Sequence, residues 1–309
     1  MDKVFNVLAV VLPVLAALAL GWFARRRKIL NDSAVESLKA LVMRIMLPMV
    51  LLNTFYKADF SVDLVIMAVC MFTFCVLGVI VGKMLSRVCT VGGKLLPFFT
   101  SGFEAGMMGY GLYVMLFSEA ERYNFAMVDL GQAIFIFTVY SALLNKQKGV
   151  STKQTLKEMV TAPIFIAVMT GVVLSATGLG ALIQQSVVGA PVDAVLDYIG
   201  TPTGVLMLFV VGYQLVWSKD SAKEVLLTTL LRTLTMAVLC AGMIFLLKMF
   251  VPMEKERFWA IVLMFSLPAP FALPIFSGDE KRQGYISAAL SVGVVFSVLL
   301  FAVISVFVK

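Results

Sequence analysis

Long apolar runs separated by short polar connections dominate the chain. An α-helix rises 1.5 Å per residue, so about 20 apolar residues are needed to cross the roughly 30 Å of hydrocarbon in a bilayer. Ten runs meet this length, at 3–23, 34–55, 63–82, 95–117, 124–144, 160–180, 192–216, 225–247, 257–277 and 284–308. The longest polar connection, 145–159, has room only for a short amphipathic helix. The pattern therefore predicts an all-α polytopic membrane protein with ten transmembrane helices, whose chemistry lies inside the bundle.

Basic residues in the connections predict how the chain is oriented. Arg25, Arg26, Arg27 and Lys28 follow the first apolar run, and no small-residue cleavage site precedes them, so we expect this run to be a retained span. Alternate connections carry 15 Lys and Arg residues on one side and 7 on the other. Cytoplasmic loops are enriched in these residues. We therefore expect a multi-pass protein of the cell (inner) membrane with both termini on the extracellular or periplasmic side.

The composition agrees with a membrane protein and disfavours several other classes. Hydrophobic residues make up 61% of the chain and charged residues 14%, against about 25% charged in a soluble domain. The net charge of +7 is accounted for by the cytoplasmic loops and does not indicate nucleic-acid binding. There is no histidine, and the four cysteines form no CxxC pair, which excludes histidine-dependent zinc sites and Ser-His or Cys-His nucleophiles. We expect no cofactor and no metal.

The two halves of the chain resemble each other. IMLP at 45–48 is similar to IGTP at 199–202, each within the second span of its half, and FSEAER at 117–122 is similar to FSGDEK at 276–281. Because each half has five spans, the second half would enter the membrane from the opposite side, which gives an inverted repeat. We expect the repeats to be 1–145 and 160–309, joined by a cytoplasmic linker at 146–159.

The fourth span of each half contains residues that disturb a helix. SGFEAGMMGYGLY, 101–113, carries four glycines and Glu104, and FSLPAPFALPIF, 265–276, carries Pro268, Pro270 and Pro274. Proline lacks the amide donor and clashes with the preceding turn, while clustered glycine loosens the backbone. Both spans are predicted to break near mid-membrane, where unwound backbone persists only against protein or a water-filled cavity. The alternative is two continuous helices packed through glycine and kinked at proline.

The sequence also resembles the auxin efflux carrier family, in particular its bacterial members. The similar stretches are VLPVLAALALGWFARRRKIL at 11–30 with MLPMVLL at 46–52, GTPTGVLMLFVVGYQL at 200–215, and LPAPFALPIFSGDE at 267–280. The resemblance implies ten spans in inverted five-span repeats and secondary transport of organic anions such as auxin, malate or malonate. It further implies a homodimeric scaffold of spans 1, 2, 6 and 7 and a mobile unit of spans 3–5 and 8–10. That unit carries substrate like an elevator, with spans 4 and 9 crossing at their breaks.

The chain departs from the family pattern at the first break. Bacterial members commonly have asparagine where Glu104 stands, at a position that contacts substrate, and proline where Gly111 stands. The fold implied by the resemblance is unaffected, but it does not follow that this chain shares the family's substrates. The candidate substrate-binding residues are Glu104, Gly106, Gly109, Pro268, Ala269, Pro270, Asn53 and Arg44.

Glu104 is the charged residue that most needs an explanation. An ionised carboxylate at mid-membrane costs at least a few kcal/mol. It can stay protonated, pair with a cation or bind one, and a purely structural salt bridge is a further alternative. We expect Glu104 to exchange the coupling proton, or else to bind sodium or the amino group of a substrate.

Other polar residues inside the spans are weaker candidates. Asp129 and Gln132 share a helical face and are candidates for the coupling-ion site, although Asp129 is also near enough to the span end to be a water-exposed structural carboxylate. Arg44 and Arg232 are expected to extend towards the headgroups. If Arg44 faces inward, it would pair with a substrate carboxylate or with Glu104. Asn53, together with Asp197 and Thr201, lies near the expected site.

These observations favour a secondary active transporter of a small organic anion, coupled to protons and working by alternating access. A sodium-coupled symporter of the bile-acid type and an amino-acid transporter remain alternatives, as does a channel. A membrane enzyme would need an acidic metal-binding cluster such as DDxxD, and none is visible.

Overall fold

The computed structural model describes residues 2–57, 61–89, 91–148, 152–216, 222–271, 273 and 280–308. Within these residues the chain is helical and has no strand. The helices of the first half are α1 (Asp2–Arg26), α2 (Asp32–Leu41), η1 (Val42–Met46), α3 (Leu47–Tyr56), α4 (Val62–Val88), η2 (Gly93–Leu95), α5 (Leu96–Phe99), η3 (Ala105–Gly109), α6 (Tyr110–Leu116), α7 (Arg122–Phe135), η4 (Ile136–Tyr140) and α8 (Ser141–Lys148). Those of the second half are α9 (Thr152–Val160), α10 (Pro163–Ala176), α11 (Leu179–Gln185), α12 (Gly189–Gly200), α13 (Thr203–Gln214), α14 (Ala222–Leu247), α15 (Lys255–Ser266) and α16 (Glu280–Val308).

Local sequence explains where several of these helices begin. Asn31 caps α2, since its side chain accepts a hydrogen bond from the amide of Ala34 at 2.8 Å. Ser61 caps α4 in the same way through the amide of Leu64 at 3.3 Å. Such caps satisfy amides that have no partner within the helix. Gly178, with φ of +73°, makes the bend between α10 and α11.

Six helical stretches in the described residues are long and apolar enough to span a bilayer, and the number rises to seven if α10 and α11, bent by 83°, form one span. The six stretches are Val7–Arg26, Val62–Val88, Arg122–Leu144, Gly189–Gln214, Ala222–Leu247 and Gln283–Val308. The second predicted span, 34–55, is divided among α2, η1 and α3. The fourth and ninth predicted spans are interrupted. The protein is thus a polytopic helical membrane protein.

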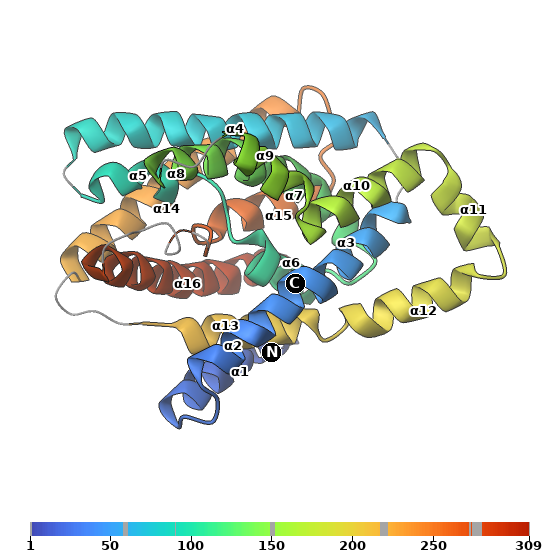
Figure 1. Ribbon diagram of the computed structural model, residues 1–309, viewed down its shortest axis with the longest axis horizontal. Helices are drawn as coiled ribbons and strands as arrows, with labels where there is room; N and C mark the ends of the chain where they lie inside the picture. Colours follow the sequence, from blue (N-terminus) through green and yellow to red (C-terminus); the bar gives the residue numbers. More distant parts are fainter. Residues whose placement is uncertain are drawn as a thin grey trace.

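Helices far apart in the sequence pack side by side. α1 lies along α13, and α3 lies along α10. The first of these contacts is close because Gly21 faces the backbone of α13, and Gly212 faces the backbone of α1. A second set of contacts joins α4 to α7, α14 to α15 and α16, and α7 to α15 (Figure 1). The interrupted segment formed by η3 and α6 lies between the two sets, since it packs on α13 as well as on α7 and α15.

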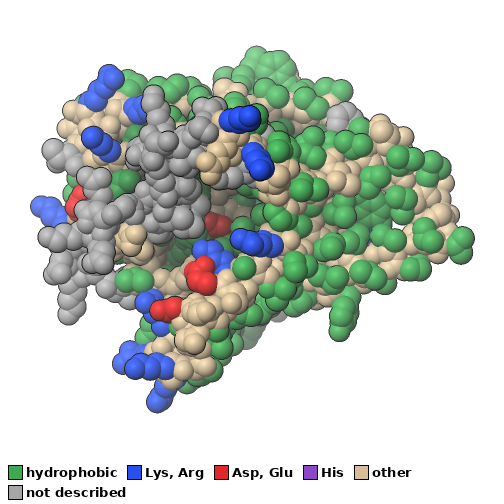
Figure 2. Space-filling view, viewed as in Figure 1, with side chains coloured by type: hydrophobic (Ala, Val, Ile, Leu, Met, Phe, Trp, Pro, Cys, Tyr) green, Lys and Arg blue, Asp and Glu red, His purple; other side chains and the backbone are tan. Residues whose placement is uncertain are grey.

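Charged and apolar side chains separate on the surface. Figure 2 shows Lys and Arg side chains over the left and centre of the molecule, several of them where α1 ends and α2 begins, while the right side over α10, α11 and α12 carries hydrophobic and uncharged side chains. In the α10–α12 region, Val187 is 97% exposed and Tyr198 is 85% exposed. Such an apolar surface requires lipid or a protein partner to cover it. We call the end of the molecule that carries Arg25, Arg26, Arg27 and Lys28 the basic end.

Candidate functional site

The two predicted interruptions are both present. In the fourth predicted span, α5 ends at Phe99 and η3 begins at Ala105, which leaves 100–104 outside regular helix. In the ninth, α15 ends at Ser266, and the chain is extended at Leu267. We call these stretches the first break and the second break.

Glycine in the first break allows a left-handed backbone and a close approach to the prolines of the second break. Gly102 has φ of +68°, in the left-handed region that side chains disfavour. A β-carbon there would lie 2.7 Å from Cδ1 of Ile136 and 3.1 Å from Cγ of Pro270, so the close approach of the second break also needs glycine. Pro268, Ala269 and Pro270 are all buried. Pro274, which was expected to contribute to the second break, lies outside the described residues, as does most of the motif at 276–281.

Glu104 joins the two breaks through its main chain and its side chain. Its amide donates to the carbonyl of Pro268 at 3.0 Å. One carboxyl oxygen, Oε1, accepts from the amide of Met107 at 3.3 Å, at the start of η3. The other, Oε2, accepts from the amide of Phe271 in the second break. The carboxyl group is therefore held between one backbone amide from each interrupted span, and its residue is 7% exposed.

Arg232 also joins the two breaks, but as a hydrogen-bond donor to their carbonyls. Its guanidinium donates to the carbonyls of Phe99 and Gly102 in the fourth span and of Leu267 in the ninth. It also lies 5.3 Å from the ring centre of Phe103. The residue is buried, so the prediction that Arg232 extends to the headgroups is wrong. It compensates carbonyls that the interrupted helices leave without partners.

Asp129 and Gln132 lie beside the first break, on α7. Asp129 accepts a hydrogen bond from the hydroxyl of Tyr110 at 2.9 Å. The side-chain amide of Gln132 donates to the carbonyl of Phe103 at 2.8 Å, directly before Glu104. Both residues are buried, and Oε1 of Gln132 has no hydrogen-bond partner among the described residues. Asp129 is therefore not the water-exposed carboxylate that was the alternative expectation.

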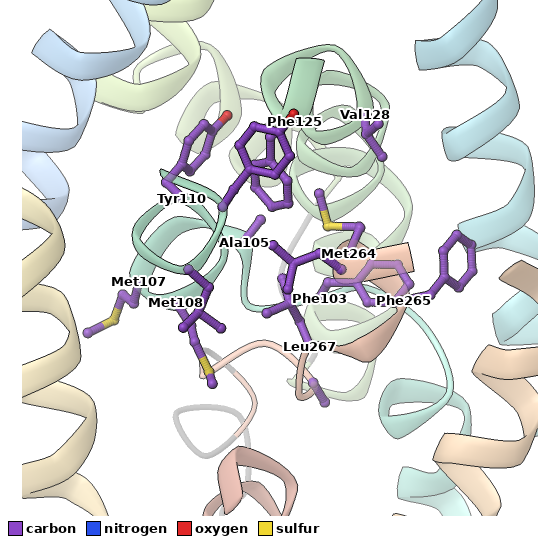
Figure 3. Packing of buried hydrophobic residues seen from close by; sticks show 14 of the residues in the cluster. Phe103, Ala105, Met107, Met108, Tyr110, Phe125, Val128, Met264, Phe265 and Leu267 are labelled. Carbon is purple, nitrogen blue, oxygen red and sulfur yellow. The ribbon is translucent and has the colours of Figure 1, made fainter. Parts of the chain in front are cut away.

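Apolar side chains close the site on the other sides. Figure 3 shows Phe103, Tyr110 and Phe125 with Met264 and Leu267 packed around the first break, drawn from α6, α7 and the end of α15. Gly109 lies within this packing, since a β-carbon there would be 2.5 Å from the ring of Phe125 and 2.8 Å from Leu267. Gly106 instead faces α3, where a β-carbon would be 3.2 Å from Leu47. The two candidate glycines thus permit close packing, and neither opens space beside Glu104.

A cavity of about 300 Å³ reaches the second break from the basic end. α1, α2 and α13 form one wall, and Phe271 with α16 forms the other. Its charged lining residues are Arg25, Asp32, Glu36 and Lys39. Lys39 also interacts electrostatically with Glu104. A solute entering this cavity would meet both signs of charge before it reached the amide of Phe271.

Two predicted binding residues lie away from Glu104. Asn53 donates to Asp197 at 2.6 Å, and both line a second cavity of about 440 Å³, which also contains Lys57 at the end opposite the basic end. Thr201 bonds the carbonyl of Asp197 and is exposed. Arg44 is exposed and has no ion pair with Glu104.

Sequence reasoning missed the position of Arg232 and the cavity residues. The position of Arg232 in its helix was a usable signal. Arg232 stands ten residues into α14, about 15 Å from the start of the helix. Its side chain cannot extend that far to the headgroups. No comparable signal marks Lys39, whose position depends on how α2 packs against distant helices.

One comparison with known proteins agrees with a membrane protein. Residues 6–152 match a family model described as a membrane transport protein. A comparison with curated proteins found no match. The matched stretch includes the first break with Glu104, together with Asp129 and Gln132. With the polytopic helical fold, this match over just under half of the chain supports membership of the auxin efflux carrier-type membrane transport family.

Proposed function

We propose that the protein is a secondary active transporter that moves a small organic anion together with a proton across the cell (inner) membrane. The observation that carries this proposal is the buried carboxyl group of Glu104, held between two interrupted spans beside a cavity that opens at the basic end. A buried carboxyl group can exchange a proton, and interrupted helices offer backbone groups to a polar solute.

The donors at the site support a carboxylate as the substrate class. A carboxylate such as malate, malonate or an auxin-like acid can accept hydrogen bonds from backbone amides like those of Met107 and Phe271. Sodium or an amino-acid substrate would instead have to bind an ionised Glu104. We favour the proton because both carboxyl oxygens already accept an amide, which leaves fewer lone pairs for a cation.

The helix contacts support alternating access between two units. α1, α3, α10, α12 and α13 would form the scaffold, and α4 to α8 with α14 to α16 would form the mobile unit, with the cavity between them. The pairing is reciprocal, since the first predicted span packs on the seventh and the second on the sixth. Two inverted repeats, 1–145 and 160–309, would produce this pairing. The exposed apolar surface of α10–α12 is where a homodimer contact would form.

Uptake into proteoliposomes tests the function. Purified protein would be screened for accumulation of radiolabelled mono- and dicarboxylates and amino acids under an imposed pH gradient, a sodium gradient or neither. We expect accumulation of at least one organic anion that requires the pH gradient and saturates with substrate. Accumulation driven only by sodium would favour the bile-acid type of symport, and non-saturating flux would favour a channel.

A further inference from the structure

The carboxyl group of Glu104 accepts backbone amides in the way that a bound carboxylate would. Each of its oxygens accepts one backbone amide, and the two amides come from different interrupted spans. Phe271, which supplies one of these amides, also lines the cavity that opens at the basic end. A carboxylate arriving through that cavity would therefore find its donors already in use.

We propose that Glu104 is a built-in ligand of this site, and that a substrate carboxylate binds by replacing it when Glu104 takes up a proton. The inference rests on the proposed function, because it names the group that the transported anion replaces. The exchange conserves charge, since one proton enters for each carboxylate charge that binds. The amides of Met107 and Phe271 pass from the carboxyl group of Glu104 to that of the substrate.

A second observation identifies an acceptor for the protonated carboxyl group. A neutral carboxylic acid has an O–H donor that needs an acceptor when buried. Gln132 is 4% exposed and already donates to the carbonyl of Phe103, the residue before Glu104, while its own Oε1 lacks a partner. This oxygen is the acceptor that a protonated Glu104 requires once it releases the two amides.

The other charged groups around Glu104 come from three elements. Lys39 lies on α2 across the cavity, Asp129 lies on α7, and Arg232 reaches the breaks from α14. The hydroxyl of Tyr140 also faces this region from η4. Arg232 is held by carbonyls, and Asp129 by Tyr110, so neither takes one of the two amides that hold Glu104.

Formate binding tests the exchange without transport. Formate is a small carboxylate that remains ionised at pH 5, and its binding to folded protein raises the melting temperature as its concentration increases. We expect no formate-dependent shift for the wild-type protein at pH 7 and a saturable shift for Glu104→Ala, in which the amides are uncovered. Formamide should produce no shift. Glu254→Ala, which removes an exposed carboxylate that does not line this cavity, should behave as the wild type does.

The pH dependence provides the second measurement, and it does not rely on the folding of Glu104→Ala. For the wild-type protein, formate affinity should rise up to tenfold for each unit that the pH falls between 7 and 5. For Glu104→Gln, which cannot take up a proton, it should be independent of pH. Gln132→Leu should reduce the rise, because the protonated carboxyl group loses its acceptor.

The outcomes separate this inference from the proposed function. If formate binds equally to the wild type and to Glu104→Ala at pH 7, or if wild-type affinity does not change with pH, then Glu104 is not the resident ligand. Transport of an organic anion could still be found in that case. If formate behaves as expected but no anion is transported, the exchange stands and the transport function fails.

Discussion

At the scale of residues, two charges of opposite sign hold the interrupted spans together. Glu104 accepts amides from both spans, and Arg232 donates to carbonyls of both. Helix ends leave amides at their starts and carbonyls at their ends without partners. A negative side chain near the start of a helix and a positive side chain near its end also match the helix dipole. The charges thus satisfy the backbone that the breaks expose, without an ion pair between them.

Arg232→Lys tests this role for the guanidinium. An ammonium group has three donors but no planar fork, so it cannot serve the carbonyls of Phe99, Gly102 and Leu267 together. Each buried carbonyl left without a partner costs about 1–3 kcal/mol. We expect a melting temperature in detergent several degrees lower than that of the wild type. Arg44→Lys, at an exposed arginine, is the matched control and should leave it unchanged; equal melting temperatures for the two variants would refute the role.

At the scale of elements, the sequence predicted the two breaks but not the side-chain contacts within them. Four glycines at 101–113 and the prolines from 268 onward are readable signals, because their effect on a helix is local. The partners of Glu104 and the buried position of Arg232 depend on how spans distant in sequence meet. The sequence therefore supported Glu104 as a candidate without showing that its carboxylate already holds the amides expected for a substrate.

Gly102→Ala tests the first break as an element. The left-handed conformation costs a non-glycine residue about 1–2 kcal/mol, and the added methyl group would press on Ile136 and Pro270. We expect a lower melting temperature and a smaller monodisperse fraction in size-exclusion chromatography. Gly284→Ala is the control, because a β-carbon on this glycine of α16 meets nothing within 4 Å. If both variants behave like the wild type, the break does not need its observed geometry.

At the scale of the whole molecule, the basic residues of the predicted cytoplasmic connections and the apolar side chains lie on different parts of the surface. Basic side chains lie over one half and the centre of the molecule, and the opposite side over α10–α12 carries hydrophobic and uncharged side chains (Figure 2). The sequence predicts ten spans, whereas the described residues contain six or seven helical stretches of sufficient length. The numbers differ because several predicted spans consist of shorter helices. Orientation in the membrane stays a prediction, since it depends on the positive-inside rule.

Cysteine labelling tests the orientation. In a variant without Cys70, Cys75, Cys89 and Cys240, a single cysteine replaces the exposed Lys153 on α9, or is added after Lys309. We expect the first to be protected from a membrane-impermeant thiol reagent in intact cells and the second to react. Both should react after the cells are made permeable. The reverse labelling in intact cells would overturn the predicted topology.

The central claim is that Glu104 couples proton movement to anion movement, and pH-driven accumulation in proteoliposomes tests it most directly. Glu104→Gln keeps the size and hydrogen-bonding capacity of the side chain but cannot take up a proton. With a substrate identified from the uptake screen, we predict that the wild-type protein accumulates it against its gradient when an inward proton gradient is imposed. Glu104→Gln should still exchange substrate across the membrane but should lose this accumulation. Accumulation by Glu104→Gln with unchanged dependence on pH would contradict the account.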